Sequence, residues 1–205
     1  MRVRWRVSLD FGRVHLRPLD KGDQRAWLQL QQENRSWLGP WEATPPDGYS
    51  RPASFPAMLR MLHEQARQGL GIPFAITVDG RLVGQVVVSG MTLGSARWAQ
   101  VGYWIARDHA GRNITTVAVA LVCDHLLQSM HLHRVELAIR PENIASLRVA
   151  EKLGFVEEGM RRRYLHIAGA WRDHLTYSIL AEDVPEGMMT RLVAAEADGR
   201  IVLPR

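Results

Sequence analysis

Residues 143–155 read NIASLRVAEKLGF, a sequence that predicts a short helix with defined ends. Asn143 stands before the helical run and is a favoured N-cap residue, and Gly154 is a typical helix stop. Asn143 and Ser146 are three residues apart and therefore share one face of the helix. Residues 134–139 precede this helix and predict a short strand, so the segment forms a strand–helix unit.

The rest of the chain predicts alternating strands and helices in the order β, α, α, β, β, β, α, β, α, β, β. The first expected elements are a strand at 13–18, a helix around 23–30, a proline-rich loop at 39–56 and a helix from Ser54 to Gly69. A hairpin of 73–78 and 82–88, a strand at 97–105 and a helix at 115–130 that buries Cys123 follow. After the unit at 134–153, the last expected element is a strand pair at 159–180 that turns at Ala168-Gly169.

Length and composition predict one domain, and the order of strands and helices makes it an α/β domain. The chain has 205 residues, of which 46% are hydrophobic, and 26 basic against 21 acidic residues give a net charge of +5. We expect a core at about 13–181 and a tail at 182–205 that is helical for a turn or two and then frayed. Apolar residues near 184–194 could pack on a second subunit.

The chain has no feature of an exported, membrane or metal-binding protein. Its single cysteine, Cys123, excludes an intrachain disulfide, and no secretory signal or bilayer-length apolar run is present. The histidine and cysteine spacing predicts no metal site. Arginines are dispersed rather than clustered, which argues against direct nucleic-acid readout. We therefore expect a cytoplasmic protein without a membrane partner.

The junction at 103–116 is the first candidate binding segment. It joins a strand to a helix, so the backbone N–H groups and the positive end of the helix dipole point to one place. Such a place suits a phosphate, although an ordinary polar turn explains the segment equally well.

The motifs Asn-x-x-Ser at 143–146 and Lys-Leu-Gly-Phe at 152–155 resemble those of the GNAT superfamily of N-acetyltransferases. Further segments resemble the Rim-type ribosomal-protein-alanine N-acetyltransferases: WLGPWE at 37–42, HRVE at 133–136, PEN at 141–143, Arg163-Tyr164 and WRDH at 171–174. This resemblance implies a mixed, mostly antiparallel sheet flanked by helices, with its fourth and fifth strands splayed apart. The fourth strand corresponds to residues 97–105.

The resemblance also implies acetyl-CoA as cosubstrate, with its pantetheine arm between the splayed strands. The residues implied in cofactor binding are Tyr103, Trp104, Ile105, Ala110, Gly111, Arg112, Asn113, Ile114, Thr115, Thr116, Asn143 and Ser146. The phosphate loop departs from the family pattern Arg/Gln-x-x-Gly-x-Gly/Ala. Asn113 can replace glycine where a positive φ is needed, and Arg112 can compensate as a phosphate partner.

The expected catalytic residues are Glu136, Ser146, Tyr164 and Asp173. Many family members carry a Tyr at the position of Ala150, and Ser146 is our substitute for the proton donor. Glu136, on a central strand, is the candidate base, and an ion pair with Arg134 or Arg140 is the alternative. Asp173 and His174, with Tyr164 on the facing strand, form a polar group that can shape the acceptor site or relay a proton.

The function implied by the resemblance is acetyl transfer to an amine. The N-terminal α-amine of a protein, such as a ribosomal protein beginning with Ala or Ser, is the preferred acceptor because its pKa is about 8, against about 10.4 for lysine. The alternatives are a small amine of the polyamine or aminoglycoside type and a non-catalytic module that senses CoA or a nucleotide.

Overall fold

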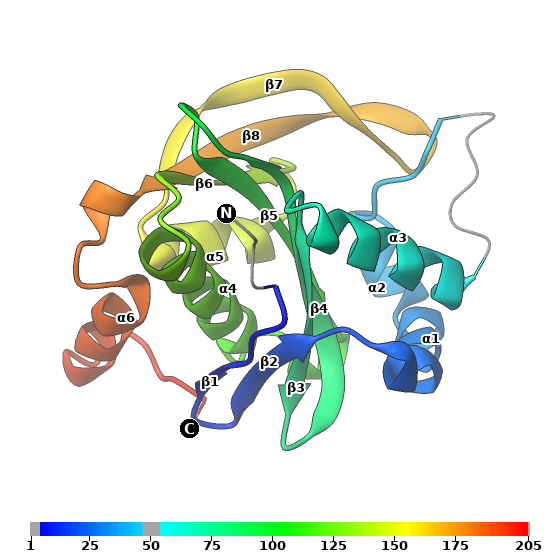
Figure 1. Cartoon of the computed structure of the whole chain (residues 1–205), viewed down its shortest axis with the longest axis horizontal. Helices are drawn as coiled ribbons and strands as arrows, with labels where there is room; N and C mark the ends of the chain where they lie inside the picture. Colours follow the sequence, from blue (N-terminus) through cyan, green and yellow to red (C-terminus); the bar gives the residue numbers. More distant parts are fainter. Residues whose placement is uncertain (1–4, 47–53, 205) are drawn as a thin grey trace.

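The computed structural model describes residues 5–46 and 54–204, which form one eight-stranded sheet with helices on both faces (Figure 1). The strand order is β1-β2-β3-β4-β5-β6-β8-β7. The strands are β1 (Leu9–Phe11), β2 (Val14–Pro18), β3 (Ile72–Val78), β4 (Arg81–Thr92), β5 (Trp98–Ile105), β6 (Arg134–Ile139), β7 (Val156–Ile167) and β8 (Ala170–Leu180). The helices are α1 (Gln24–Glu33), α2 (Arg35–Leu38), α3 (Phe55–Arg67), α4 (Ile114–Asp124), α5 (Ile144–Leu153) and α6 (Met188–Ala197).

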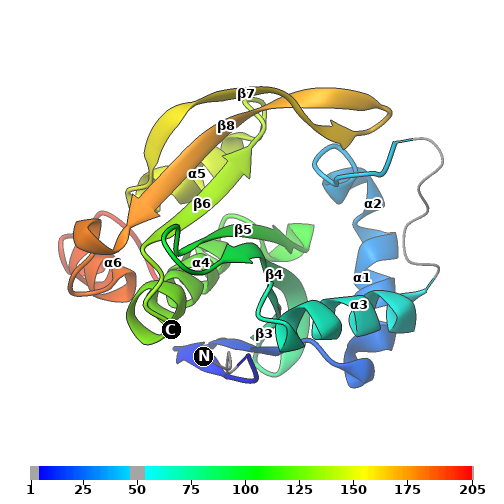
Figure 2. The ribbon, with the colours of Figure 1, turned by 45° about the horizontal axis from the view of Figure 1, so that its top comes forward.

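Alternating side chains on the central strands separate two hydrophobic clusters. Ile72, Phe74 and Ile76 of β3 belong to the large cluster that includes α4, α5 and α6, whereas Ala75 faces the smaller cluster with α3. This alternation follows from the two-residue period of a strand. Figure 2 shows α1, α2 and α3 on one side of the sheet and α4, α5 and α6 on the other.

The sheet opens between β5 and β6, the only parallel pair among its described strands. Their register covers three residue pairs and ends at Gln100↔Glu136, although β5 continues to Ile105. Beyond that point β5 stays paired with β4, and β6 stays paired with β8 as far as Ile139. The two strands diverge in Figure 2. The expected mixed and mostly antiparallel sheet, splayed at this position, is confirmed.

Three differences from the sequence-based expectations have local physical causes. A short strand, β1, precedes the first expected strand, because Gly12 adopts a positive φ of 54° in the turn between them. The expected helix at 115–130 ends as an α-helix at Asp124 and continues as a π-helical turn, His125–Ser129. Pro56, placed in the expected loop, lies in the first turn of α3, where its missing N–H costs nothing.

The C-terminal tail forms α6, and beyond this helix Ile201 and Leu203 are buried. The N-cap residue of α6, Gly187, has no side chain, and the carboxylate of Asp124 on α4 accepts the N–H groups of Met188 (2.5 Å) and Met189 (2.9 Å) in its place. Val184, Met188 and Leu192 are buried in the large cluster of the same chain. Tail residues therefore complete the core, and packing of the tail on a second subunit stays a prediction.

Among the residues that the structure describes, no helix is long and apolar enough to cross a membrane.

We predict that replacing Leu192 with Ala lowers the free energy of unfolding by about 2–5 kcal/mol, because the substitution leaves a cavity in the core. The side chain of Leu192 is 1% exposed, whereas that of its neighbour Val193 is 39% exposed. Val193→Ala is the matched control and should change stability by less than about 0.5 kcal/mol. Denaturant titration of both variants measures the difference, and equal small effects would contradict a docked tail.

Candidate active site

A cavity of about 290 Å³ lies where β5 and β6 diverge, and we call it the V cavity. Its walls come from β4, β5, β6, β7, β8, the start of α5 and the segment after α2. The lining residues are Trp41, Val87, Ser89, Gln100, Val101, Gly102, Tyr103, Leu137, Ala138, Ile139, Arg140, Asn143, Ser146, Leu165 and His174. Successive residues of β6 line it, so the cavity is bounded by side chains from both faces of the sheet.

The loop from β5 to α4 enters the helix through two residues with a left-handed backbone. Gly111 and Asn113 both adopt positive φ angles, of 74° and 58°. Asn113 is the N-cap residue of α4, yet its side chain makes no capping hydrogen bond. The first N–H groups of α4 are therefore not capped by the Asn113 side chain, and they lie at the positive end of the helix dipole. This arrangement fits a phosphate group.

Contacts from Asn34, which joins α1 to α2, and from Trp37 on α2 fix the start of this loop, and sequence reasoning did not predict them. The side-chain oxygen of Asn34 accepts the N–H of Arg107 at 2.8 Å, and Trp37 Nε1 donates to the carbonyl of Ile105 at 3.0 Å. The indole of Trp104 points to the same side and donates to Gln85 at 3.3 Å. Ile105 is thus held by α2, and Trp104 is held by Gln85 of β4 and by an edge-on ring contact with Trp27 of α1, whereas Tyr103 lines the V cavity.

The N-terminus of α5 supplies polar groups to the V cavity. Asn143 caps the helix, because its side-chain oxygen accepts the N–H of Ser146 at 3.1 Å, as the sequence predicted. The hydroxyl of Tyr103 is buried and makes no hydrogen bond of normal geometry among the described residues. Burial raises the pKa of Tyr103 to about 12, and the neighbouring Ser146 opposes part of that rise. A buried donor without a partner is costly, which fits a cavity shaped for a ligand.

Glu136 lies in an ion-pair network at the point where β5 and β6 separate. Its carboxylate accepts hydrogen bonds from Arg134 Nε and from an Arg161 guanidinium nitrogen, each at 2.8 Å, and the residue is 7% exposed. Arg134 also pairs with Glu158 on β7. The expected alternative of an ion pair is therefore present with Arg134 but not with Arg140, which bonds to Glu142 and to the carbonyl of Pro40.

The structure divides the polar group expected on β8, because neighbouring residues of a strand face opposite sides. His174 is 3% exposed and lines the V cavity, and its ring packs edge-on against Tyr164 at a centroid distance of 5.7 Å. Asp173 is exposed instead, and its carboxylate accepts the N–H of Arg163 at 2.7 Å. Asp173 thus holds the backbone of β7 and does not line the V cavity.

His174 presents one ring nitrogen that can accept a proton. Its Nδ1 lies 3.1 Å from the carbonyl of Arg172, and because a carbonyl only accepts, Nδ1 carries the hydrogen in the neutral ring. Nε2 is then the acceptor. Burial lowers the pKa of His174, and the charge of Arg140 adds to that shift. The expected catalytic set named Asp173 and omitted His174, although strand alternation could have indicated that only one of them faces the cavity.

Within the described residues, no group of three or more His, Cys, Asp and Glu side chains is placed to hold a metal ion.

Comparisons with known proteins agree with this geometry. The sequence model of the acetyltransferase (GNAT) domain family matches residues 13–156. A protein of Bacillus subtilis named "Probable N-acetyltransferase YjcK" is 33% identical over 172 residues, which cover 83% of this chain and 95% of that protein. The "[Ribosomal protein uS5]-alanine N-acetyltransferase" of Escherichia coli is 28% identical over 169 residues, covering 80% of this chain and 87% of that protein.

A solved structure extends the similarity to almost the whole chain. It is described as Mycobacterium smegmatis RimJ in complex with CoA-disulfide, and it has a TM-score of 0.88 and 38% identity, covering 94% of this chain and 96% of that one. The chain belongs to the GNAT superfamily, within the group of Rim-type enzymes, and is an N-acetyltransferase that uses acetyl-CoA.

Proposed function

We propose that this enzyme acetylates the N-terminal α-amine of a protein, and that a ribosomal protein beginning with Ala or Ser is the first substrate to test. The observation that carries the proposal is the charge of the V cavity. Its described lining residues include one guanidinium, that of Arg140, and no carboxylate. Polyamines and aminoglycosides carry several positive charges and are bound best by acidic sites. A single amine with a pKa of about 8 needs no such partner.

The relatives support the same class of acceptor. The Escherichia coli protein is named for acetylating an alanine of ribosomal protein uS5, and this chain aligns with most of its length. A ribosomal substrate would also place the enzyme in the cytoplasm.

The chain's own residues suit direct transfer, for which acetyl-CoA supplies the activated thioester. We assign the N–H groups of 114–116 to the diphosphate, and the edge of β5 around Tyr103 to the pantetheine arm. The amine nitrogen forms a bond to the acetyl carbon as the C–S bond breaks. His174 Nε2, directly or through water, takes the proton that the amine loses. The departing thiolate takes a proton through the Ser146 hydroxyl, which lies beside the Tyr103 hydroxyl and takes a proton from water in turn.

The remaining expected residues support these groups. Tyr164 positions His174 through its ring contact, and Asp173 fixes the backbone of β7 at Arg163. Glu136 braces β6 against β7 directly through Arg161, and Arg134, its other partner, reaches β7 through Glu158.

We predict that the purified enzyme, supplied with acetyl-CoA, acetylates peptides that begin with Ala or Ser on the α-amine and leaves spermidine and aminoglycosides nearly unmodified. Mass spectrometry of the products locates the acetyl group. The control is the same peptide with a blocked N-terminus and one internal lysine, which should not react. Faster turnover of spermidine than of every peptide would contradict the proposal.

We predict that Ser146→Ala lowers kcat by about 100-fold, because general-acid assistance is worth about 10²–10⁴ in rate and water replaces part of it. CoA affinity should change little, since the Ser146 N–H that Asn143 caps is kept. Ser146→Thr retains a hydroxyl and should recover most of the rate. Steady-state kinetics test this assignment, and an Ala variant with the parent kcat would rule it out.

We predict that Glu136→Gln acts on stability more than on turnover. Removing the charge leaves Arg161 without its ion-pair partner and Arg134 with Glu158 alone, in a partly buried network, which should cost about 1–3 kcal/mol of unfolding free energy. Glu64→Gln is the matched control, because Glu64 forms an exposed ion pair with Arg67 on α3 and should cost less than about 1 kcal/mol. A loss of kcat at unchanged stability would instead identify Glu136 as the base.

A further inference from the structure

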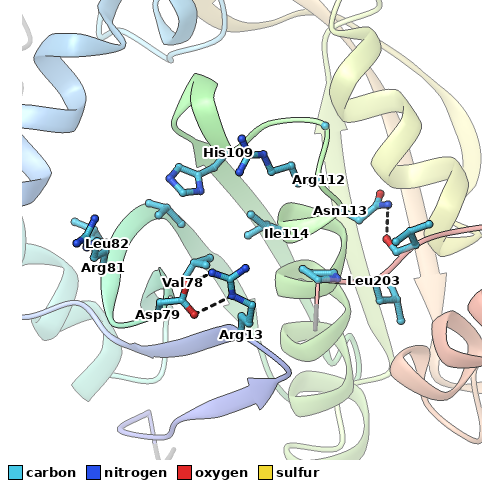
Figure 3. A pocket seen from close by; sticks show the side chains of 14 residues that line it. Arg13, Val78, Asp79, Arg81, Leu82, His109, Arg112, Asn113, Ile114 and Leu203 are labelled. Atoms are coloured by element: carbon cyan, nitrogen blue, oxygen red, sulfur yellow. Dashed lines mark hydrogen bonds and ion pairs between the residues drawn. The ribbon is translucent and has the colours of Figure 1, made fainter.

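The side chain of Asn113 connects three parts of the chain at the phosphate loop. Its Oδ1 accepts a hydrogen bond from Lys152 Nζ on α5 at 2.7 Å, and its Nδ2 donates to the carbonyl of Val202 at 2.8 Å. The second bond is the dashed line beside Asn113 in Figure 3. One residue of the loop is therefore bonded both to α5 and to the C-terminal segment.

The C-terminal segment at 200–204, which we call the strap, is itself held in place. Ile201 and Leu203 are 9% and 5% exposed and belong to the large hydrophobic cluster. The N–H of Leu203 donates to Glu196 on α6 at 2.8 Å, and the carbonyl of Pro204 accepts the N–H of Arg13 at 3.4 Å. The strap can therefore serve as a fixed support for whatever bonds to it.

The phosphate loop also borders an open cleft. A cleft of about 830 Å³ lies between the turn from β3 to β4, at Val78 and Asp79, and the loop residues His109, Arg112 and Asn113 (Figure 3). The strap forms a further wall of this cleft. On the side of the cleft, the hydrogen bond from Asn113 to Val202 connects the loop to the strap, which is anchored by the buried Ile201 and Leu203.

An asparagine at an N-cap ordinarily turns its oxygen back to the N–H groups of its own helix. Asn113 does not, and its backbone has the left-handed φ of 58° that glycine adopts more cheaply. Glycine would meet the backbone requirement but could make neither bond. The outward side chain therefore leaves the helix N–H groups open to a ligand and fixes the loop that presents them.

We propose that Asn113 is a positioning residue through which the strap and Lys152 hold the phosphate loop in the shape that binds the diphosphate of acetyl-CoA. This inference rests on the assignment of the diphosphate to 114–116 made above. The strap then contributes to cofactor affinity without any contact of its own with the cofactor.

A double-mutant cycle tests the coupling. CoA affinity is measured by calorimetry for the full chain, Asn113→Gly, a chain ending at Gly199, and the combination. Asn113→Gly and the truncation should each weaken binding by about 3- to 10-fold, as expected for the loss of one or two hydrogen bonds. The combination should be no weaker than the worse single variant, because both act through one contact. Full additivity, or an unchanged or tighter Kd for Asn113→Gly, overturns the proposal.

A second readout needs no ligand. Amide hydrogen exchange at 111–116 in the ligand-free protein should be at least about threefold faster in Asn113→Gly than in the parent, since the loop has lost its support. Arg200→Gln is the matched control, because Arg200 is at the start of the strap and its side chain pairs with Asp198, whereas Asn113 bonds to Val202 and Lys152; exchange and Kd should stay within about twofold. If the truncated chain melts early, Leu203→Ala replaces it as the variant that loosens the strap. Equal exchange in parent and Asn113→Gly overturns the coupling.

The same data separate this proposal from the proposed function. CoA should protect the amides of 111–116 in the parent protein, and absence of that protection refutes the assignment on which the coupling rests. A parent enzyme that binds CoA with this protection, yet acetylates none of the peptides, refutes the α-amine acceptor and leaves the coupling standing.

Discussion

The site depends on the point at which β5 and β6 stop pairing. Their ladder ends at Gln100↔Glu136, and beyond it each strand keeps its partner only on the other side. A parallel pair that separates inside a sheet leaves backbone groups and side chains of both faces open to one space. The ion pairs of Glu136 with Arg161 and of Arg134 with Glu158 tie β6 to β7 across β8 at this same point. We infer that this bracing replaces the rigidity that β6 loses with its other neighbour.

The opening also explains how the polar residues are divided between roles. Ser146 and Asn143 line the V cavity from the α5 end, Tyr103 lines it from β5, and His174 lines it from β8. The two groups to which we assign proton transfer, Ser146 and His174, are thereby kept apart. Asp173 is next to His174 in sequence but faces the other side, where it bonds to the β7 backbone. The strand period thus separates a residue that can meet substrate from one that supports the strand.

Much of the architecture could be predicted from the sequence, because strand alternation, helix caps and the Asp79-Gly80 turn are local features. The cap at Asn143, the stop at Gly154 and the burial of Cys123 all follow from the residue and its close neighbours. The docked tail could not be predicted in this way. Its helix begins at a glycine, and the group that caps it is the carboxylate of Asp124, more than sixty residues earlier in the chain. Asn34 and Trp37, which hold the phosphate loop, escaped prediction for the same reason.

The phosphate loop shows where a local argument is right about the backbone and incomplete about the side chain. The sequence predicted that Asn113 can take a positive φ in place of glycine, and the loop has that conformation. Local rules then favour an asparagine that caps its own helix. Lys152 and the carbonyl of Val202 are better placed partners, and neither can be identified without the fold. The departure from a glycine-rich loop therefore need not weaken the site, because the residue that replaces glycine bonds the loop to α5 and to the strap.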